Sequence, residues 1–240
     1  MTALVHTPLF GLLLTIGAYR FAVWLYQRSH RFPLIQPLLH PFLVAMIPVI
    51  TMLTLLGISY REYMDQTRLL QFFLGPATVA LAWPLYRQLT HVRAVGGQVL
   101  VAVVVGGSLA ASIAVGLAWW LDAPADVLGS LAPKSITTPI ALEVVKLTGG
   151  IAPLAAGAVA ITGIVGVMMA PVVFRLLKIT DDRVRGLTLG IVAHAIGTSR
   201  AFEFSERAGA FSSLALGLTG LFTAMALPMI WPWVAELLTK

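Results

Sequence analysis

The chain has 240 residues, of which 58% are hydrophobic and 11% are charged, and its net charge at pH 7 is +6. Soluble domains carry about 25% charged residues, so this composition excludes a soluble globular protein and predicts an all-α protein that crosses the bilayer several times. The chain contains no cysteine, which excludes disulfides, thiolate metal sites and cysteine nucleophiles. No basic, aromatic-interleaved surface indicates a nucleic-acid partner, and the positive charge is better explained by loops that set membrane topology.

Eight apolar segments follow one another along a single integral membrane domain that we expect to cover residues 1–240. They span approximately residues 8–26, 34–57, 69–87, 95–121, 127–147, 150–175, 186–204 and 208–238. Several exceed the roughly 20 residues that cross a hydrocarbon core of about 30 Å. The first begins near Pro8 without a basic flank or a small-residue cleavage site, so we interpret it as a span and not as a signal peptide. The charged residues at 61–68 predict a solvated loop.

The fifth segment departs most from a simple span. Its central sequence, LAPKSITTPIALEVVK at 131–146, places Lys134, several hydroxyls and two prolines among apolar residues. Pro133 and Pro139 each remove a backbone donor, so a straight helix cannot continue through this sequence. Irregular backbone at membrane depth persists only where protein or a water-filled cavity satisfies it. The segment therefore predicts a re-entrant or broken element at about 127–147 that lines a polar site, and the alternative is an aqueous loop between two spans.

The distribution of basic residues supports a re-entrant fifth segment. Bases follow the first segment (Arg28, Arg31), the third (Arg87, Arg93) and the sixth (Arg175, Lys178, Arg183, Arg185). Cytoplasmic loops carry an excess of Lys and Arg, and these three loops share one side only if the fifth segment enters and leaves on the same side. We therefore expect about seven transmembrane helices plus one re-entrant element, with the amino terminus outside and the carboxyl terminus inside.

This topology places segments two to four and six to eight in opposite orientations, as inverted repeats at about 34–121 and 150–238. Many secondary transporters are built from inverted repeats and bind their substrates where helices are interrupted. The predicted interruptions are Pro76, Thr78 and Pro84 in the third segment and residues 194–200 in the seventh.

The polar residues of the seventh segment are candidates for binding an anion and a proton. On a helix, His194 shares a face with Gly197 and Thr198, and the ordinary pKa of histidine, about 6.5, suits a proton carrier. Arg200 can bind a carboxylate through its planar fork or pair with Glu203. The competing interpretations are that His194 is a core residue with satisfied hydrogen bonds and that Arg200 and Glu203 form an ion pair near the segment end.

These sequences resemble the LrgB/CidB family, which includes bacterial inner-membrane proteins and the LrgB-like half of the plastidial glycolate/glycerate translocator. The resemblance is carried by LAPKSITTPIA at 131–141, HAIGTSR at 194–200 with Glu203, GAFSSLAL at 209–216 and, less specifically, GISY at 57–60 and AWPLY at 82–86. It implies inverted repeats of crossed, broken helices, as in cation/proton antiporter-like transporters. It also implies an inner-membrane location and a small LrgA/CidA-type membrane protein as partner, and we add the lipid bilayer and a second copy of the chain as expected partners.

The resemblance implies two competing functions. One is transport of small monocarboxylates such as glycolate, glycerate or pyruvate, and the other is antiholin-like regulation of murein hydrolase export and cell lysis. We favour transport by alternating access, with proton coupling through a titratable group, because a purely regulatory protein gains nothing from burying Lys134, His194 and Arg200. The predicted substrate-binding residues are Lys134, Ser135, Thr137, Thr138, Thr78, Gly197, Thr198 and Arg200, the predicted coupling residues are His194 and Glu203, and the predicted helix breaks are Pro76, Pro84, Pro133 and Pro139.

An enzyme is the third class of function that the residues permit. Ser199 or Ser135 as nucleophile with His194 as base would form an intramembrane hydrolase. However, His194 and Ser199 point to different faces of one helix, and the sequence contains neither a Gly-x-Ser-x-Gly elbow nor a His-Glu-x-x-His motif. We therefore predict that the chain is not an enzyme and needs no metal or other cofactor.

Overall fold

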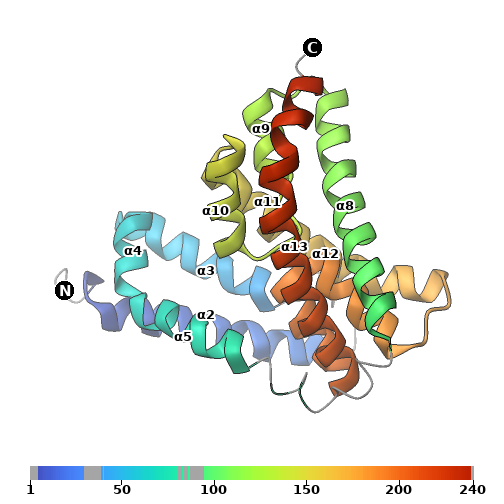
Figure 1. Cartoon of the computed structure of the whole chain (residues 1–240). Helices are drawn as coiled ribbons and strands as arrows, with labels where there is room; N and C mark the ends of the chain where they lie inside the picture. Colours follow the sequence, from blue (N-terminus) through green and yellow to red (C-terminus); the bar gives the residue numbers. More distant parts are fainter. Residues whose placement is uncertain are drawn as a thin grey trace. The chain divides into compact units, whose positions relative to one another are not determined.

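The computed structural model describes residues 5–29, 39, 41–80, 83, 86 and 95–238, and the regular elements in these residues are helices (Figure 1). Side chains are described for the same residues except 74, 75 and 77–79. The chain divides into two compact units, Met1–Ala80 and Leu81–Lys240, and each is described by itself. The predicted all-α architecture is confirmed for the described residues.

The first unit contains α2 (Pro8–Arg28), α3 (Pro41–Leu56), α4 (Tyr60–Gln66) and α5 (Arg68–Ala80). α2 begins after Thr7, whose hydroxyl accepts a hydrogen bond from the amide of Phe10, and it packs against α3 and α4. α3 and α4 form one bent pair with an angle of 115° between them. Gly57 lies at this bend with φ of +67°, a conformation that glycine adopts without steric cost.

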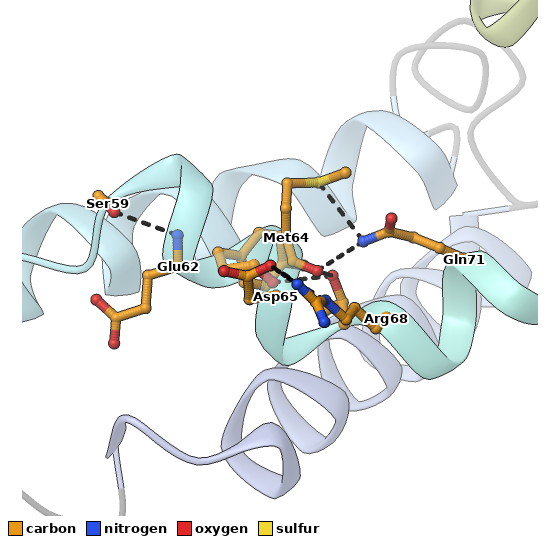
Figure 2. A network of polar contacts seen from close by, with 8 residues as sticks. Ser59, Glu62, Met64, Asp65, Arg68 and Gln71 are labelled. Atoms are coloured by element: carbon orange, nitrogen blue, oxygen red, sulfur yellow. Dashed lines mark hydrogen bonds and ion pairs between the residues drawn. The ribbon is translucent and has the colours of Figure 1, made fainter.

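The charged residues at 61–68 lie in helical turns and not in the loop that their composition predicts (Figure 2). Ser59 caps α4, because its hydroxyl accepts a hydrogen bond of 3.2 Å from the amide of Glu62. Arg68 pairs with Asp65 at 2.8 Å, and both side chains are mostly exposed. The prediction that these residues are solvated is therefore correct. The prediction of a loop was wrong, because it did not consider that Ser59 can cap a helix.

The third apolar segment is described as α5 up to Ala80. Pro76, which was expected to break this segment, lies inside α5, and the helix continues beyond it. A proline removes one backbone hydrogen bond and kinks a helix without always ending it. The side chain of Thr78 and the whole of Pro84 lie outside the described residues, so their predicted roles stay predictions.

Two long helices of the second unit, α8 (Gly96–Trp120) and α13 (Glu206–Leu238), run parallel to each other (Figure 1). Near their amino-terminal ends, Val99 packs in one apolar cluster with Phe211. Near their carboxyl-terminal ends, the indole of Trp119 donates a hydrogen bond of 3.0 Å to the carbonyl of Leu238. Both helices therefore end on the same side of the unit.

α9 (Ala125–Leu131) and α10 (Thr138–Thr148) form a hairpin whose base lies at this same end. The amide of Ile151, which follows α10, donates a hydrogen bond of 2.7 Å to the hydroxyl of Ser130 in α9. α11 (Ala152–Leu176) starts at this end as well and runs opposite to α8, since its last turns pack against the start of α12 at the other end. We call residues 125–148 the Lys134 hairpin.

α12 (Asp182–Phe204) is a second hairpin, because the chain reverses at His194. The hydroxyl of Ser205, just after α12, donates a hydrogen bond of 2.8 Å to the carboxylate of Asp182 at its start. The ends of a straight helix of 23 residues would be about 34 Å apart. Gly197 also contacts the carbonyl of Leu189, eight positions earlier, which a straight helix forbids. We call residues 182–204 the His194 hairpin.

The reversal changes the expected topology. The seventh segment was expected to be an interrupted span, and the interruption is confirmed at His194. The prediction that the segment crosses the membrane once was wrong, because each arm is much shorter than the roughly 20 residues that a span needs. The second unit thus alternates long helices with hairpins in the order α8, Lys134 hairpin, α11, His194 hairpin, α13, and the two hairpins have their bases at opposite ends. α13 begins beside the basic loop after α11 and ends on the other side. The carboxyl-terminal end of α13 therefore lies on the side opposite the basic loop, and not on the same side as predicted.

Four described helices are long and apolar enough to cross a membrane, namely α2, α8, α11 and α13, and the bent pair α3–α4 brings the number to at most five. Their large apolar side chains are widely exposed, as at Leu13 (62%) and Met229 (75%), which suits contact with lipid. The chain is therefore a polytopic integral membrane protein. The expected total of about seven spans is not reached in the described residues, since α12 reverses and the third segment is described only in part.

Candidate functional site

The tip of the Lys134 hairpin is a turn that the prolines impose. Pro133 lies fully buried in the turn, and Pro139 stands in the first turn of α10, where a missing amide hydrogen costs no helical bond. The break predicted at these two prolines is confirmed. Lys134 is partly buried at the tip, and its ammonium donates a hydrogen bond of 3.3 Å to the hydroxyl of Ser135. The described residues offer Lys134 no carboxylate partner.

Close contacts at the base hold the Lys134 hairpin closed. The hydroxyl of Thr148 donates a hydrogen bond of 3.0 Å to the carbonyl of Gly129. A Cβ on Gly150 would lie 2.7 Å from the amide nitrogen of Ser130, so only glycine permits this approach. Gly149 ends α10 with φ of +69°, the left-handed conformation of a helix carboxyl cap. These base residues were not predicted from the sequence, in which Gly149 and Gly150 stand at the junction of the fifth and sixth segments.

His194 occupies the tip of the second hairpin with φ of +42° and ψ of −130°, a conformation that L residues rarely adopt. It is buried, and its Nε2 lies 2.9 Å from the carbonyl oxygen of Val159 in α11. A carbonyl only accepts, so Nε2 carries the hydrogen and donates it. A Cβ on Gly163 would lie 2.8 Å from the imidazole, and this glycine therefore makes the space for the ring. Such strain persists only where surrounding contacts enforce it, and it concentrates at functional sites.

Two hydroxyls link the reversal at His194 to α13 through hydrogen bonds. Thr198 donates a hydrogen bond of 2.9 Å to the carbonyl of His194, and its oxygen lies 3.0 Å from the hydroxyl of Ser212. Because Thr198 has one hydrogen and gives it to the carbonyl, Ser212 is the donor in the second bond. Both hydroxyls are fully buried, so each bond satisfies a group that would otherwise cost about 1–3 kcal/mol. Gly190 contacts the Ser212 carbonyl, which fixes the first arm of the hairpin against α13.

Both hairpin tips pack against the first half of α11, at Val159. Ile136, at the tip of the Lys134 hairpin, packs in a buried cluster with Val159, whose carbonyl binds His194. The structure therefore places four of the predicted site residues at or next to two tips that share Val159 as a neighbour: Lys134 and Ser135 on one hairpin, and His194 and Thr198 on the other.

Two helix amino termini begin at the tips. α10 starts after Thr137, whose side chain makes no capping hydrogen bond, and the second arm of the His194 hairpin starts after His194. Helix amino termini carry unpaired amides and a partial positive charge, which favours an anion. Thr137 and Thr138 are partly buried in this region. The ammonium of Lys134 adds a full positive charge to these two partial ones.

Arg200 and Glu203 lie farther along the second arm, toward the base of the hairpin. They form an ion pair with each other, and the guanidinium of Arg200 also lies 5.2 Å from the ring centre of Phe204. This arrangement corresponds to the competing interpretation of a pair near the segment end. Gly197 contacts the opposite arm of the hairpin. A Cβ at this position would collide with the Leu189 carbonyl, so the glycine allows the two arms to pack closely.

His194 forms no hydrogen bond with a serine nucleophile among the described residues, as a hydrolase would require. The hydrogen bond of the His194 ring goes to the Val159 carbonyl and not to a serine. Ser199 donates a hydrogen bond of 3.2 Å to the Ala195 carbonyl. Among the described residues, no three His, Asp or Glu side chains lie close enough to hold a metal ion.

Comparison with known proteins identifies the family of this chain. The family model described as "LrgB-like family" matches residues 15–233. The chain belongs to the LrgB-like family. The resemblance seen in the LAPKSITTPIA and HAIGTSR sequences is thereby confirmed. The first contains the tip of the Lys134 hairpin, and the second begins at the tip of the His194 hairpin and continues into its second arm.

Relatives of this LrgB-like protein match it over nearly their whole length. The "Uncharacterized protein YwbG" of Bacillus subtilis (strain 168) is 34% identical over 220 residues, which cover 92% of this chain and 96% of the relative. "Uncharacterized protein YxaC" of the same strain is 35% identical over 223 residues, with coverages of 91% and 93%. The "Antiholin-like protein LrgB" of Bacillus cereus (strain B4264) is 30% identical over 228 residues, with coverages of 95% and 97%. No solved structure matches the chain.

Proposed function

We propose that this LrgB-like protein is a secondary transporter that carries small monocarboxylates across the bacterial inner membrane by alternating access. The observation that supports this proposal is that both hairpin tips pack at Val159 of α11: one tip carries Lys134, which has no carboxylate partner among the described residues, and the other carries the buried His194. A charge at membrane depth is costly, and such residues mark substrate pathways in membrane proteins. Secondary transporters bind anions at the amino termini of broken helices, and a helix begins at each of the two tips.

The substrate class follows from the charge and size of the tip region. One fixed ammonium and two partial positive helix ends match one carboxylate. The hydroxyls of Ser135 and Thr137 can contact the carboxylate or a hydroxyl group of the substrate. Ile136 and Val159 pack directly beside this position, which favours an anion of glycolate or pyruvate size over a larger one.

The two hairpins also supply a route to alternating access. Their bases lie at opposite ends of the second unit, so opening one base exposes the tips to one side while the other base stays closed. The hydrogen bond between Ser205 and Asp182 closes one base, and that between Ser130 and Ile151 closes the other. Each gate is therefore a small number of polar contacts, which motion of one hairpin arm can break.

We propose His194 as the group that couples transport to protons. Its Nε2 already donates to Val159, so Nδ1 is the nitrogen that would take up a proton. Glu203, the other coupling candidate, pairs with Arg200 away from the tip, which favours His194. A monocarboxylate that enters with one proton moves no net charge, so accumulation would follow the pH gradient and not the voltage.

Uptake by purified protein in liposomes tests the proposal. Labelled glycolate, glycerate and pyruvate are offered with and without an imposed pH gradient, and a dicarboxylate serves as the size control. The proposal predicts saturable uptake of the monocarboxylates and weak uptake of the dicarboxylate. Absence of uptake and of counterflow for all three monocarboxylates would contradict it.

The second candidate function is antiholin-like regulation of murein hydrolase export, which is favoured by the name of the Bacillus cereus relative, an antiholin-like protein. We propose a small LrgA/CidA-type membrane protein and a second copy of the chain as partners under either function. Expression of a transport-dead variant discriminates the functions: restoration of normal lysis by this variant, in cells that lack the protein, would favour regulation.

A further inference from the structure

A basic pocket lies at the base of the His194 hairpin, away from the hairpin tips. It is a cavity of about 460 Å³ between the end of α11, the following loop and both ends of α12. Three basic side chains line it, namely Arg175, Lys178 and Arg185, together with the rings of Phe174 and Phe204. No carboxylate is among the lining residues. The pocket therefore presents positive charge beside an apolar wall.

The charges of this pocket are mostly unpaired. The described residues place no carboxylate within ion-pair distance of Arg175 or Lys178. Arg185 is held in position, since its Nε donates a hydrogen bond of 3.0 Å to the Ile179 carbonyl, and its contact with Asp182 is long at 3.6 Å. An anion with several acceptor oxygens can therefore bind all three side chains without displacing a strong ion pair.

The surroundings place this pocket at the membrane surface. It lies at the last turns of α11, a helix long and apolar enough to cross a membrane. Leu176 and Leu177, next to the pocket, are 75% and 67% exposed, so apolar side chains continue outward from the basic groups. A ligand that combines a negative head group with hydrocarbon chains matches both parts.

We propose that this pocket binds the phosphate head group of an anionic phospholipid from the cytoplasmic leaflet. The loop that contributes Lys178 carries the excess of basic residues that marks the cytoplasmic side, where anionic lipids attract basic pockets. Arg185 belongs to the first arm of the His194 hairpin and Phe204 ends the second arm. A bound head group therefore holds both arms against α11 and stabilises the closed base of the hairpin.

The test measures lipid binding to the purified full-length protein in phosphatidylcholine nanodiscs. Short-chain phosphatidylglycerol is titrated against the parent, against the double variant Arg175→Gln/Lys178→Gln, and against the control Arg68→Gln/Lys146→Gln. The control removes the same charge from exposed bases outside the pocket. We expect at least tenfold weaker binding in the pocket variant, with the control equal to the parent, and a rise of the parent's melting temperature with phosphatidylglycerol.

Three outcomes would overturn the proposal. The first is a parent protein that binds phosphatidylglycerol no better than phosphatidylcholine, which decides the question even if the pocket variant fails to fold. The second is equal loss of binding in the control and the pocket variant. The third is an equal rise of the melting temperature with inorganic phosphate and with the lipid, because the pocket would then bind a free anion.

Discussion

His194 donates a hydrogen bond of 2.9 Å from its Nε2 to the carbonyl oxygen of Val159, 35 positions earlier in the chain. This bond joins the tip of the His194 hairpin to Val159 in the first half of α11, where the tip of the Lys134 hairpin also packs. It fixes the ring orientation, since the carbonyl cannot donate. Any proton that His194 gains must therefore bind Nδ1.

The reversal at His194 predicts a cross-link between the two ends of α12. The chain contains no native cysteine, so the double variant Asp182→Cys/Ser205→Cys carries only the two introduced thiols. We expect rapid oxidation to a disulfide, or joining by a short bismaleimide, because the native side chains lie 2.8 Å apart. The control Asp182→Cys/Ala195→Cys, whose residues lie at the base and next to the tip of the hairpin, should not cross-link. Cross-linking of the control alone would contradict the hairpin.

His194→Gln separates the proton-coupling role of His194 from its structural role. A glutamine amide can donate to the Val159 carbonyl, so the variant should fold and exchange substrate across the liposome membrane. It cannot titrate near neutral pH, so accumulation driven by a pH gradient should be lost. The measurement compares counterflow with net uptake under an imposed gradient. A variant that still concentrates substrate would assign proton coupling to another group or remove it.

Gly163→Ala tests whether space for the imidazole is needed. The added methyl would lie 2.8 Å from the ring, so the ring must move and weaken its bond to Val159. We expect transport to fall at least tenfold in protein that still inserts. Gly157→Ala on the same helix is the matched control, since a Cβ there meets nothing within 4 Å, and it should be neutral or stabilising by up to about 1 kcal/mol. Equal activity of the two variants would remove Gly163 from the site.

Asp181, in the loop before α12, predicts a pH-dependent contribution to stability. The hydrogen bonds from Arg183 lower the pKa of this carboxyl to about 2, below the ordinary value of about 3.9. Because the folded-state pKa is the lower one, the contribution is complete above about pH 4 and is lost as the pH falls toward 2. The melting temperature of Asp181→Asn should therefore lie below that of the parent at pH 7 and approach it at pH 3. An equal difference at both pH values would contradict this assignment.

The sequence predicted those features that depend on local chemistry. Pro133 and Pro139 exclude a helix wherever they stand, so the turn around Lys134 could be anticipated. The long helices α8 and α11 follow from uncharged apolar runs, and their bounds lie within two residues of the predicted 95–121 and 150–175.

The reversal at His194 could not be predicted in the same way. HAIGTSR contains no proline, and a positive φ at histidine is enforced only by tertiary contacts with Val159, Gly163 and α13. The available signal was the run of Gly186, Gly190 and Gly197, each of which permits a close backbone approach within the hairpin or to α13. The position of Arg200, toward the base of the hairpin and not at its tip, could not be predicted for the same reason, because it depends on the reversal.

Uptake of glycolate by Lys134→Ala protein in liposomes tests the central claim most directly. Lys134 is the unpaired cation at the hairpin tips, whereas Lys146 is exposed and pairs with Glu143 at 2.7 Å, so Lys146→Ala is the matched control. A lost charge-assisted bond of about 1.5–3 kcal/mol corresponds to a loss of roughly 10- to 100-fold in kcat/KM. We predict that loss for Lys134→Ala, with normal insertion and a Lys146→Ala protein as active as the parent. Undiminished glycolate uptake by Lys134→Ala would contradict the account.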